Sequence, residues 1–177
     1  MTRLLRVCLL ASLAGCGSLA GCGSAEATAP RTPDTAPSEP VQFTFGTVDG
    51  GELSSDTTRG RTTALLFVTT FDLPSQAEAR LLAEVLSEHK PRANAGIVML
   101  EPPHSAPLAQ VWRDAIGITL PVAMASHSLL VGQSELGRVS GVPTLLVLDR
   151  LGRIVVRREG ALARPEIVEC LRRADDA

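Results

Sequence analysis

The sequence predicts an α/β fold in which a mixed central sheet is flanked by helices. The apolar run Ala64–Val68 is followed by a long segment whose apolar residues recur at helical spacing. A second apolar run, Ile97–Leu100, is again followed by such a segment. Two further runs, Leu145–Leu148 and Ile154–Arg158, can pair as a hairpin before a closing helix at Pro165–Ala174. This order of strands and helices is typical of one layered domain.

The composition is that of a globular protein, with 45% hydrophobic and 20% charged residues among 177. Aromatic residues make up only 3%, so the core must consist mainly of Leu, Val, Ile and Ala. The formal net charge of −2 gives no support for binding to nucleic acid. Three of the four cysteines lie in the first 22 residues. Only Cys170 lies in the expected domain, which excludes an internal disulfide and a zinc site of the usual spacing.

Residues 1–22 have the pattern of a secretory signal: Arg3 and Arg6 precede an apolar run that is too short to span a membrane. The run ends in Leu-Ala-Gly-Cys, and the same four residues recur six positions later. This motif resembles the bacterial lipobox, whose Cys is acylated. Either Cys16 or Cys22 is then the lipidation site, with Cys22 slightly favoured because Cys16 would leave a very short signal. The alternative is an ordinary cleaved signal.

Residues 23–40 contain four prolines among Ala, Ser, Thr and Glu and no large apolar residue. Such a composition predicts a disordered tether. We therefore expect a domain at residues 41–177 that is held to a membrane by its N-terminal lipid and faces the periplasm. The cell envelope is the expected location, with the outer membrane slightly favoured.

The domain is expected to open with a β-hairpin extension. Val41–Thr47 alternates, with Phe43 and Phe45 on one face, and predicts a strand. Asp49-Gly50-Gly51 is a turn signal, and Glu52–Ser54 would return as a second strand. The segment Ser55–Arg61 is expected to be a polar loop.

The central strand Ala64–Val68 leads through a tight turn into a helix over Ser75–Lys90. Ser75 and Glu78 have the spacing of a capping box, which places the helix start near Pro74.

A second helix is predicted over Ala106–Ile116, with Leu108, Val111, Trp112 and Ile116 on one side and Gly117 at its end. A short strand at Leu120–Ala125 and a weakly helical segment at Ser128–Val139 are expected to follow.

Two motifs resemble the thioredoxin-like superfamily, in particular its membrane-anchored TlpA/ResA-type thiol-disulfide oxidoreductases, or redoxins. In that family a Trp-Cys-x-Pro-Cys sequence joins the central strand to the helix. Phe71 here stands at the Trp, Asp72 at the first Cys, Pro74 at the Pro and Ser75 at the second Cys. The second motif is Gly-Val-Pro-Thr at residues 141–144, whose proline is cis in the family.

The resemblance implies a thioredoxin-like fold with a degenerate Cys-x-x-Cys site. Because both thiols are replaced, we expect a non-redox module that binds a peptide or an envelope protein. Asp72 and Ser75 are expected to act mainly as helix caps. The expected groove consists of Phe71, Leu73, Pro74, Val142 and Pro143.

Two alternatives remain open. One is residual thiol-disulfide or peroxidase-type chemistry through Cys170 or a partner's thiol, although Cys170 is expected to be buried. The other is a structural envelope module. No cofactor is expected, the domain is expected to be monomeric, and the histidines (His89, His104, His127) are too far apart in sequence to predict a metal site.

Overall fold

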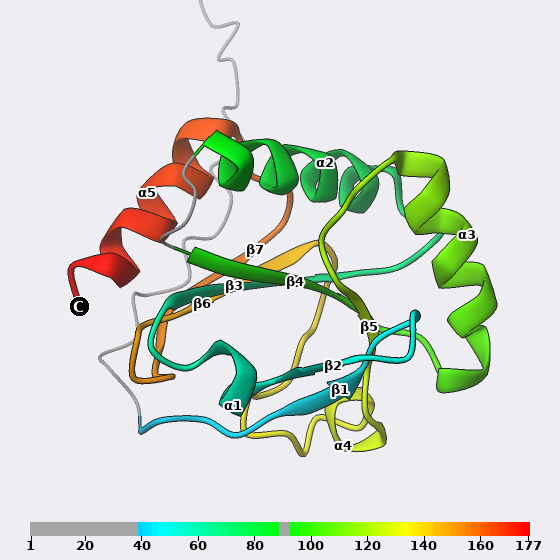
Figure 1. Ribbon diagram of the computed structural model, residues 1–177, viewed down its shortest axis with the longest axis horizontal. Coiled ribbons are helices and arrows are strands. Elements are labelled where there is room, and N and C mark those ends of the chain that lie inside the picture. The colour runs from blue at the N-terminus through cyan, green and yellow to red at the C-terminus, as the bar shows by residue number, and fades with distance from the viewer. Residues whose placement is uncertain (1–38, 89–92) are drawn as a thin grey trace, which may run out of the picture. The chain divides into compact units, whose positions relative to one another are not determined.

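The computed structural model describes residues 39–88 and 93–177. Its main sheet has five strands in the order β5-β4-β3-β6-β7 (Figure 1). Central β3 (Thr62–Val68) is parallel to β4 (Ala93–Met99) and antiparallel to β6 (Thr144–Leu148). On the flanks β4 is parallel to β5 (Val122–Met124), and β6 is antiparallel to β7 (Ile154–Glu159). The predicted mixed sheet is confirmed.

The three longest helices cover one face of this sheet (Figure 1). They are α2 (Leu73–Glu88), α3 (Ala106–Ile116) and α5 (Arg164–Asp175). A short 3-10 helix, η1 (Pro103–Ser105), precedes α3. The bounds of α3 agree with the prediction, and the backbone of Gly117 (φ +70°) ends that helix as expected.

The opposite face is covered by a hairpin of β1 (Thr44–Gly46) and β2 (Glu52–Ser54), together with α1 (Ser55–Thr58) and α4 (His127–Leu130). Figure 1 shows these elements on the side of the sheet away from α2. The predicted N-terminal hairpin is therefore confirmed, and it forms a second, thinner layer.

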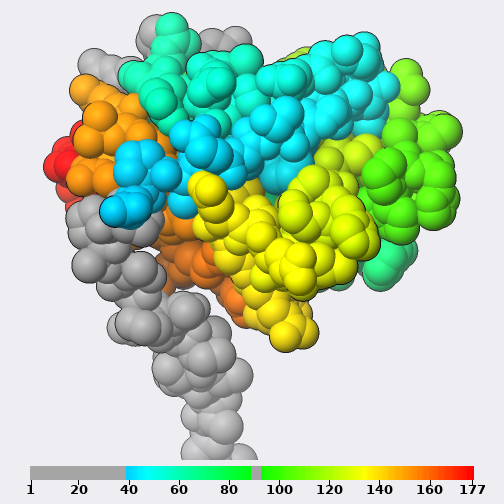
Figure 2. All heavy atoms as spheres, turned by 90° about the horizontal axis from the view of Figure 1, so that it is seen from below, coloured from blue at the N-terminus to red at the C-terminus, as the bar shows by residue number. Residues whose placement is uncertain are grey.

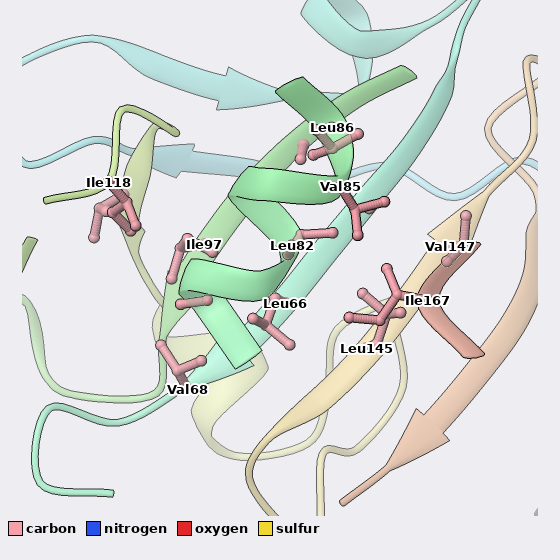
Figure 3. Close-up of a cluster of buried hydrophobic side chains, with 14 of the residues drawn as sticks. Leu66, Val68, Leu82, Val85, Leu86, Ile97, Ile118, Leu145, Val147 and Ile167 are labelled. Carbon is pink, nitrogen blue, oxygen red and sulfur yellow. The ribbon is translucent and has the colours of Figure 1, made fainter. Parts of the chain in front are cut away.

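Alternation along β3 divides the core into two clusters. Leu66 and Val68 contact the helices, whereas Leu65 and Phe67 contact the hairpin side. All seven residues of β3 are buried. Figure 3 shows the helical cluster, in which Leu82 of α2 and Ile167 of α5 lie over the sheet. Both side chains are completely inaccessible to solvent.

The first strand is shorter than expected, because regular pairing begins only at Thr44. Its alternation is nevertheless as predicted, with Val41, Phe43 and Phe45 buried against the sheet. Gly50 at the tip of the turn has a φ of +84°, a value that favours glycine.

Three local expectations were wrong. The segment after β2 is not all loop, because Ser54 caps the single turn of α1 through a hydrogen bond from the Thr57 backbone N–H to its hydroxyl. On α3, Leu108 and Val111 are exposed, and only the stripe that contains Trp112 is buried. Of the weakly helical segment 128–139, only α4 is helical, and it begins earlier, at His127.

The described chain begins beside the β6–β7 turn. Pro40 forms an antiparallel bridge with Arg153, and the Val41 N–H donates to the Gly152 carbonyl over 2.9 Å. Within that turn, Asp149 accepts hydrogen bonds from the backbone N–H groups of Leu151 and Arg153. No helix among residues 39–88 and 93–177 has the length and apolar character needed to cross a bilayer.

We expect Leu82→Ala to lower the free energy of unfolding by about 2–5 kcal/mol, because it leaves a cavity in the helical cluster. Urea denaturation measures the change. Leu108→Ala, on the exposed face of α3, is the matched control and should cost less than about 0.5 kcal/mol. Equal losses in both variants would contradict the assignment of the two helix faces.

Candidate functional site

The candidate site lies at the end of the central strand β3, where the chain turns into α2. Phe67, near the end of β3, pairs with Thr144, the first residue of β6. Pro143 immediately precedes Thr144, so it lies at the same end of the strands as the turn between β3 and α2. The Val142–Pro143 peptide bond is cis, which confirms the expectation for this motif.

Asp72 is the N-cap of α2. Its Oδ2 accepts hydrogen bonds from the Ser75 backbone N–H over 2.8 Å and from Ser75 Oγ over 2.5 Å, and its carbonyl accepts from the Gln76 N–H. A carboxylate at this position also interacts favourably with the helix dipole. The predicted capping box between Ser75 and Glu78 is wrong, because the helix already begins at Leu73 and is capped by Asp72, whose carboxylate accepts both the N–H and the hydroxyl of Ser75.

Ser75 therefore lies inside the first turn of the helix. Its side chain is fully buried, and its hydroxyl is committed to the Asp72 carboxylate. A hydroxyl in this state is not accessible to a substrate. The arrangement explains Asp72 and Ser75 as a helix-terminus pair.

Apolar side chains surround this cap on the outside. Phe71 is 81% exposed and Leu73 is 74% exposed, and Pro74 is also exposed. Across the edge, Val142 is half-buried and Pro143 is buried. Phe71 and Leu73 are the two most exposed large apolar side chains among the described residues.

The turn that carries Phe71 is held in place by Glu101, in the segment after β4. Glu101 Oε1 accepts hydrogen bonds from the Thr70 N–H over 2.6 Å and from Thr70 Oγ1 over 2.8 Å, and the Glu101 side chain is buried. Sequence reasoning missed this contact, since the two residues are 31 positions apart.

Glu78 is a buried acid one turn into α2. Its side chain is 2% exposed, its Oε2 accepts the Leu162 N–H over 3.1 Å, and its Oε1 has no hydrogen-bond partner among the described residues. Burial raises the pKa of Glu78 to about 7, with a smaller rise from Glu166 and an opposing effect of the Leu162 N–H. The sequence held a signal for this burial, because Glu78 lies one turn before Leu82 on the same face of the helix.

The remaining candidate residues do not join this site. Cys170 is a free thiol in the helical cluster, and burial raises its pKa. His104 and His127 are exposed on separate elements, and His89, like Cys16 and Cys22, lies outside the described residues. Within the part of the chain that the structure describes, no three His, Cys, Asp or Glu side chains gather as a metal site would require.

Solved structures with the same fold are thioredoxin-family proteins. A thiol:disulfide interchange protein of Chlorobium tepidum aligns with a TM-score of 0.64 and 23% identity over 78% of this chain and 99% of its own. A DsbF homologue of Corynebacterium diphtheriae aligns with a TM-score of 0.67 and 17% identity over 77% of this chain and 86% of its own. The exposed lipoprotein thioredoxin of Streptococcus pneumoniae aligns with a TM-score of 0.62 and 20% identity over 74% of this chain and 98% of its own.

These likenesses establish that the chain has a thioredoxin-like fold, as the two motifs indicated. No protein-family model and no curated protein matches the sequence. Identity below 25% supports the fold alone, so the activity has to be argued from the chain's own residues.

We expect Asp72→Ala to lower the free energy of unfolding by about 2 kcal/mol. The variant removes the helix cap and leaves the buried Ser75 hydroxyl without its acceptor. Asp72→Asn retains an acceptor oxygen and should lose clearly less in urea denaturation. If both variants were as stable as the unmodified protein, Asp72 would not be the cap.

The raised pKa of Glu78 predicts a pH dependence of stability. The folded state binds this proton more tightly than the unfolded state, whose pKa is near 4.5. The stabilisation is therefore complete below pH 4.5 and is lost as the pH rises towards 7, a difference of up to about 3 kcal/mol. Glu78→Gln should flatten the stability profile over this range, whereas Glu52→Gln, at an exposed position, should leave it unchanged. An unchanged profile for Glu78→Gln would refute the assignment.

Proposed function

We propose that this protein is an envelope lipoprotein whose thioredoxin-fold domain binds an extended segment of another protein without exchanging disulfides. The observation that carries the proposal is the Asp72–Ser75 pair at the start of α2. In the proposal these two residues stand where thiol-disulfide oxidoreductases have their two cysteines.

Thiol-disulfide exchange requires a thiolate that attacks a disulfide sulfur. Neither a carboxylate nor a serine hydroxyl can form the mixed disulfide, and serine cannot follow the oxidation steps open to cysteine. Cys170 does not replace the missing thiols, because it is buried in the core and its pKa is raised. This burial counts against the alternative of residual redox chemistry through Cys170.

The proposed binding surface consists of Phe71, Leu73, Pro74, Val142 and Pro143. The exposed Phe71 and Leu73 offer apolar contacts to a partner. The cis bond before Pro143 lies at the start of β6, where the backbone of Val142 can pair with an extended peptide by strand addition. The partner is expected to be an envelope protein or peptide, and no cofactor takes part.

The proposed location rests on the N-terminus. Residues 1–22 carry the signal pattern, Cys16 or Cys22 would carry the lipid, and residues 23–40 would form the tether. That one structural neighbour is described as an exposed lipoprotein is consistent with this organisation. A structural role in the envelope, without a bound partner, is the competing reading.

Restoring the thiols tests the correspondence of Asp72 and Ser75 with the two cysteines. Asp72 and Ser75 lie three positions apart at the first turn of α2 with their side chains in contact, so we expect two cysteines here to be close enough to form a disulfide. We expect the double variant Asp72→Cys, Ser75→Cys to reduce insulin in the presence of dithiothreitol, whereas the unmodified chain should show only background. Turnover by the unmodified chain above that of Pro143→Ala would refute the non-redox proposal.

Crosslinking in cells tests the binding surface. A photo-crosslinking amino acid at Leu73 or Val142 should trap a common partner. The same amino acid at Leu151 is the control, because this residue is 58% exposed but lies in the β6–β7 turn, away from the site. Equal products at all three positions, or none at Leu73 and Val142, would favour the structural role.

A further inference from the structure

A polar hollow, separate from the candidate site, lies on the hairpin side of the molecule. We call it the edge cleft; its volume is about 370 Å³, within the range of ligand-binding clefts. Figure 2 shows the face on which residues 39–45 (blue) run alongside residues 130–139 (yellow). The lining residues come from β1 with its preceding segment and from the region around α4: Gln42, Phe43, Thr44, Phe45, Ser126, Ser128, Gln133, Ser134 and Glu135.

The backbone of β1 has an open edge towards this cleft. The Ser55 N–H donates to the Phe43 carbonyl, which directs the backbone groups of Phe43 and Phe45 towards β2. In an antiparallel pair, the intervening Thr44 directs its N–H and carbonyl the opposite way. Among the described residues, these two groups of Thr44 have no hydrogen-bond partner.

The edge of β1 is open because the chain after β5 no longer pairs with the hairpin at Thr44. Thr47 still forms an antiparallel bridge with Ala123, and the Val48 N–H donates to the Val122 carbonyl. Beyond Ser126, however, the chain turns into α4. The edge cleft thus occupies the place that a neighbouring strand of β1 would take.

Glu135 already imitates such a neighbour at one position. Its Oε2 accepts the Gln42 N–H over 2.6 Å, so a side chain satisfies a backbone donor that a strand would otherwise satisfy. Protein edges are often protected by charged groups in this way. The contact is solvent-exposed and can be exchanged for a peptide carbonyl at small cost.

The side chains of the cleft define the chemistry of its occupant. Hydroxyls of Ser126, Ser128 and Ser134 and the amide of Gln133 offer neutral hydrogen bonds. Of the described residues that line the cleft, Glu135 alone is charged, so an acidic ligand is disfavoured and a basic side chain has a counter-charge.

We propose that the edge cleft binds an extended basic peptide as an added strand on β1. The peptide backbone pairs with the N–H and carbonyl of Thr44, and a Lys or Arg side chain faces Glu135. This site is separate from the proposed surface at Phe71 and Val142, and either can exist without the other.

The test follows backbone amide shifts of the full chain, solubilised in a mild non-ionic detergent, during titration with acetyl-Thr-Val-Lys-Val-Thr-amide. The resonances of Thr44 and Ser128 should shift saturably. A peptide with Glu at its centre should bind about two- to fivefold more weakly, as expected for one exposed ion pair. Methylation of one pairing peptide nitrogen should weaken binding about fivefold, as expected for one lost hydrogen bond.

Variants separate backbone pairing from charge. Thr44→Pro removes the edge N–H and should weaken all the peptides, whereas Glu135→Gln should abolish only the preference for Lys over Glu. Glu52→Gln, on the other hairpin strand, is the control and should change neither. If Thr44→Pro unfolds the protein, the methylated peptide still tests the pairing.

Four results would overturn the proposal. The first is the absence of shifts at Thr44 and Ser128 up to about 5 mM peptide, a range that would detect even millimolar binding. The second is a set of shifts confined to residues 71–74 and 142. The third is saturable shifts with a neutral sugar, an N-acetylglucosamine trimer, but not with the peptide, and the fourth is concentration-dependent dimerisation through β1, which would assign the edge to a second copy.

Discussion

The burial of β3 on both faces is the constraint on which the rest of the fold depends. A strand with no exposed residue needs a layer of apolar side chains on each side, and its edges need hydrogen-bonded neighbours. The helices α2, α3 and α5 supply one layer, and the hairpin β1–β2 supplies the other. Because β4 and β6 hydrogen-bond to the backbone of β3 on both sides, the turn that follows Val68 has a fixed position at the end of the central strand.

Long elements could be predicted from the sequence because apolar periodicity and termination signals agreed. Helix α3 is an example, since the glycine that ends it follows directly on its last apolar residue. The start of α2 was misplaced because two possible capping residues lie there, and Asp72, three positions before Ser75, caps the helix by accepting the Ser75 N–H. The exposure of Leu108 and Val111 could not be foreseen, because the stripe of apolar residues on α3 is wider than the surface that covers it.

The candidate site was predictable in its residues but not in its interactions. The cis bond before Pro143 followed from a local motif. The roles of Glu101 and Glu78 depend on partners 31 and 84 positions away, which no local pattern reveals. The edge cleft is a similar case, because it forms between segments about 90 residues apart in the chain.

The bridge between Pro40 and Arg153 has a consequence for how the domain is oriented. Arg153 follows the end of β6 that pairs with the beginning of β3, whereas Asp72 and Pro143 lie beyond the other end. Seven residues of strand separate the two edges by about 20 Å. An attachment through the N-terminus would therefore be made at the end of the sheet opposite Phe71 and Leu73, which would leave that apolar tip free to meet other molecules.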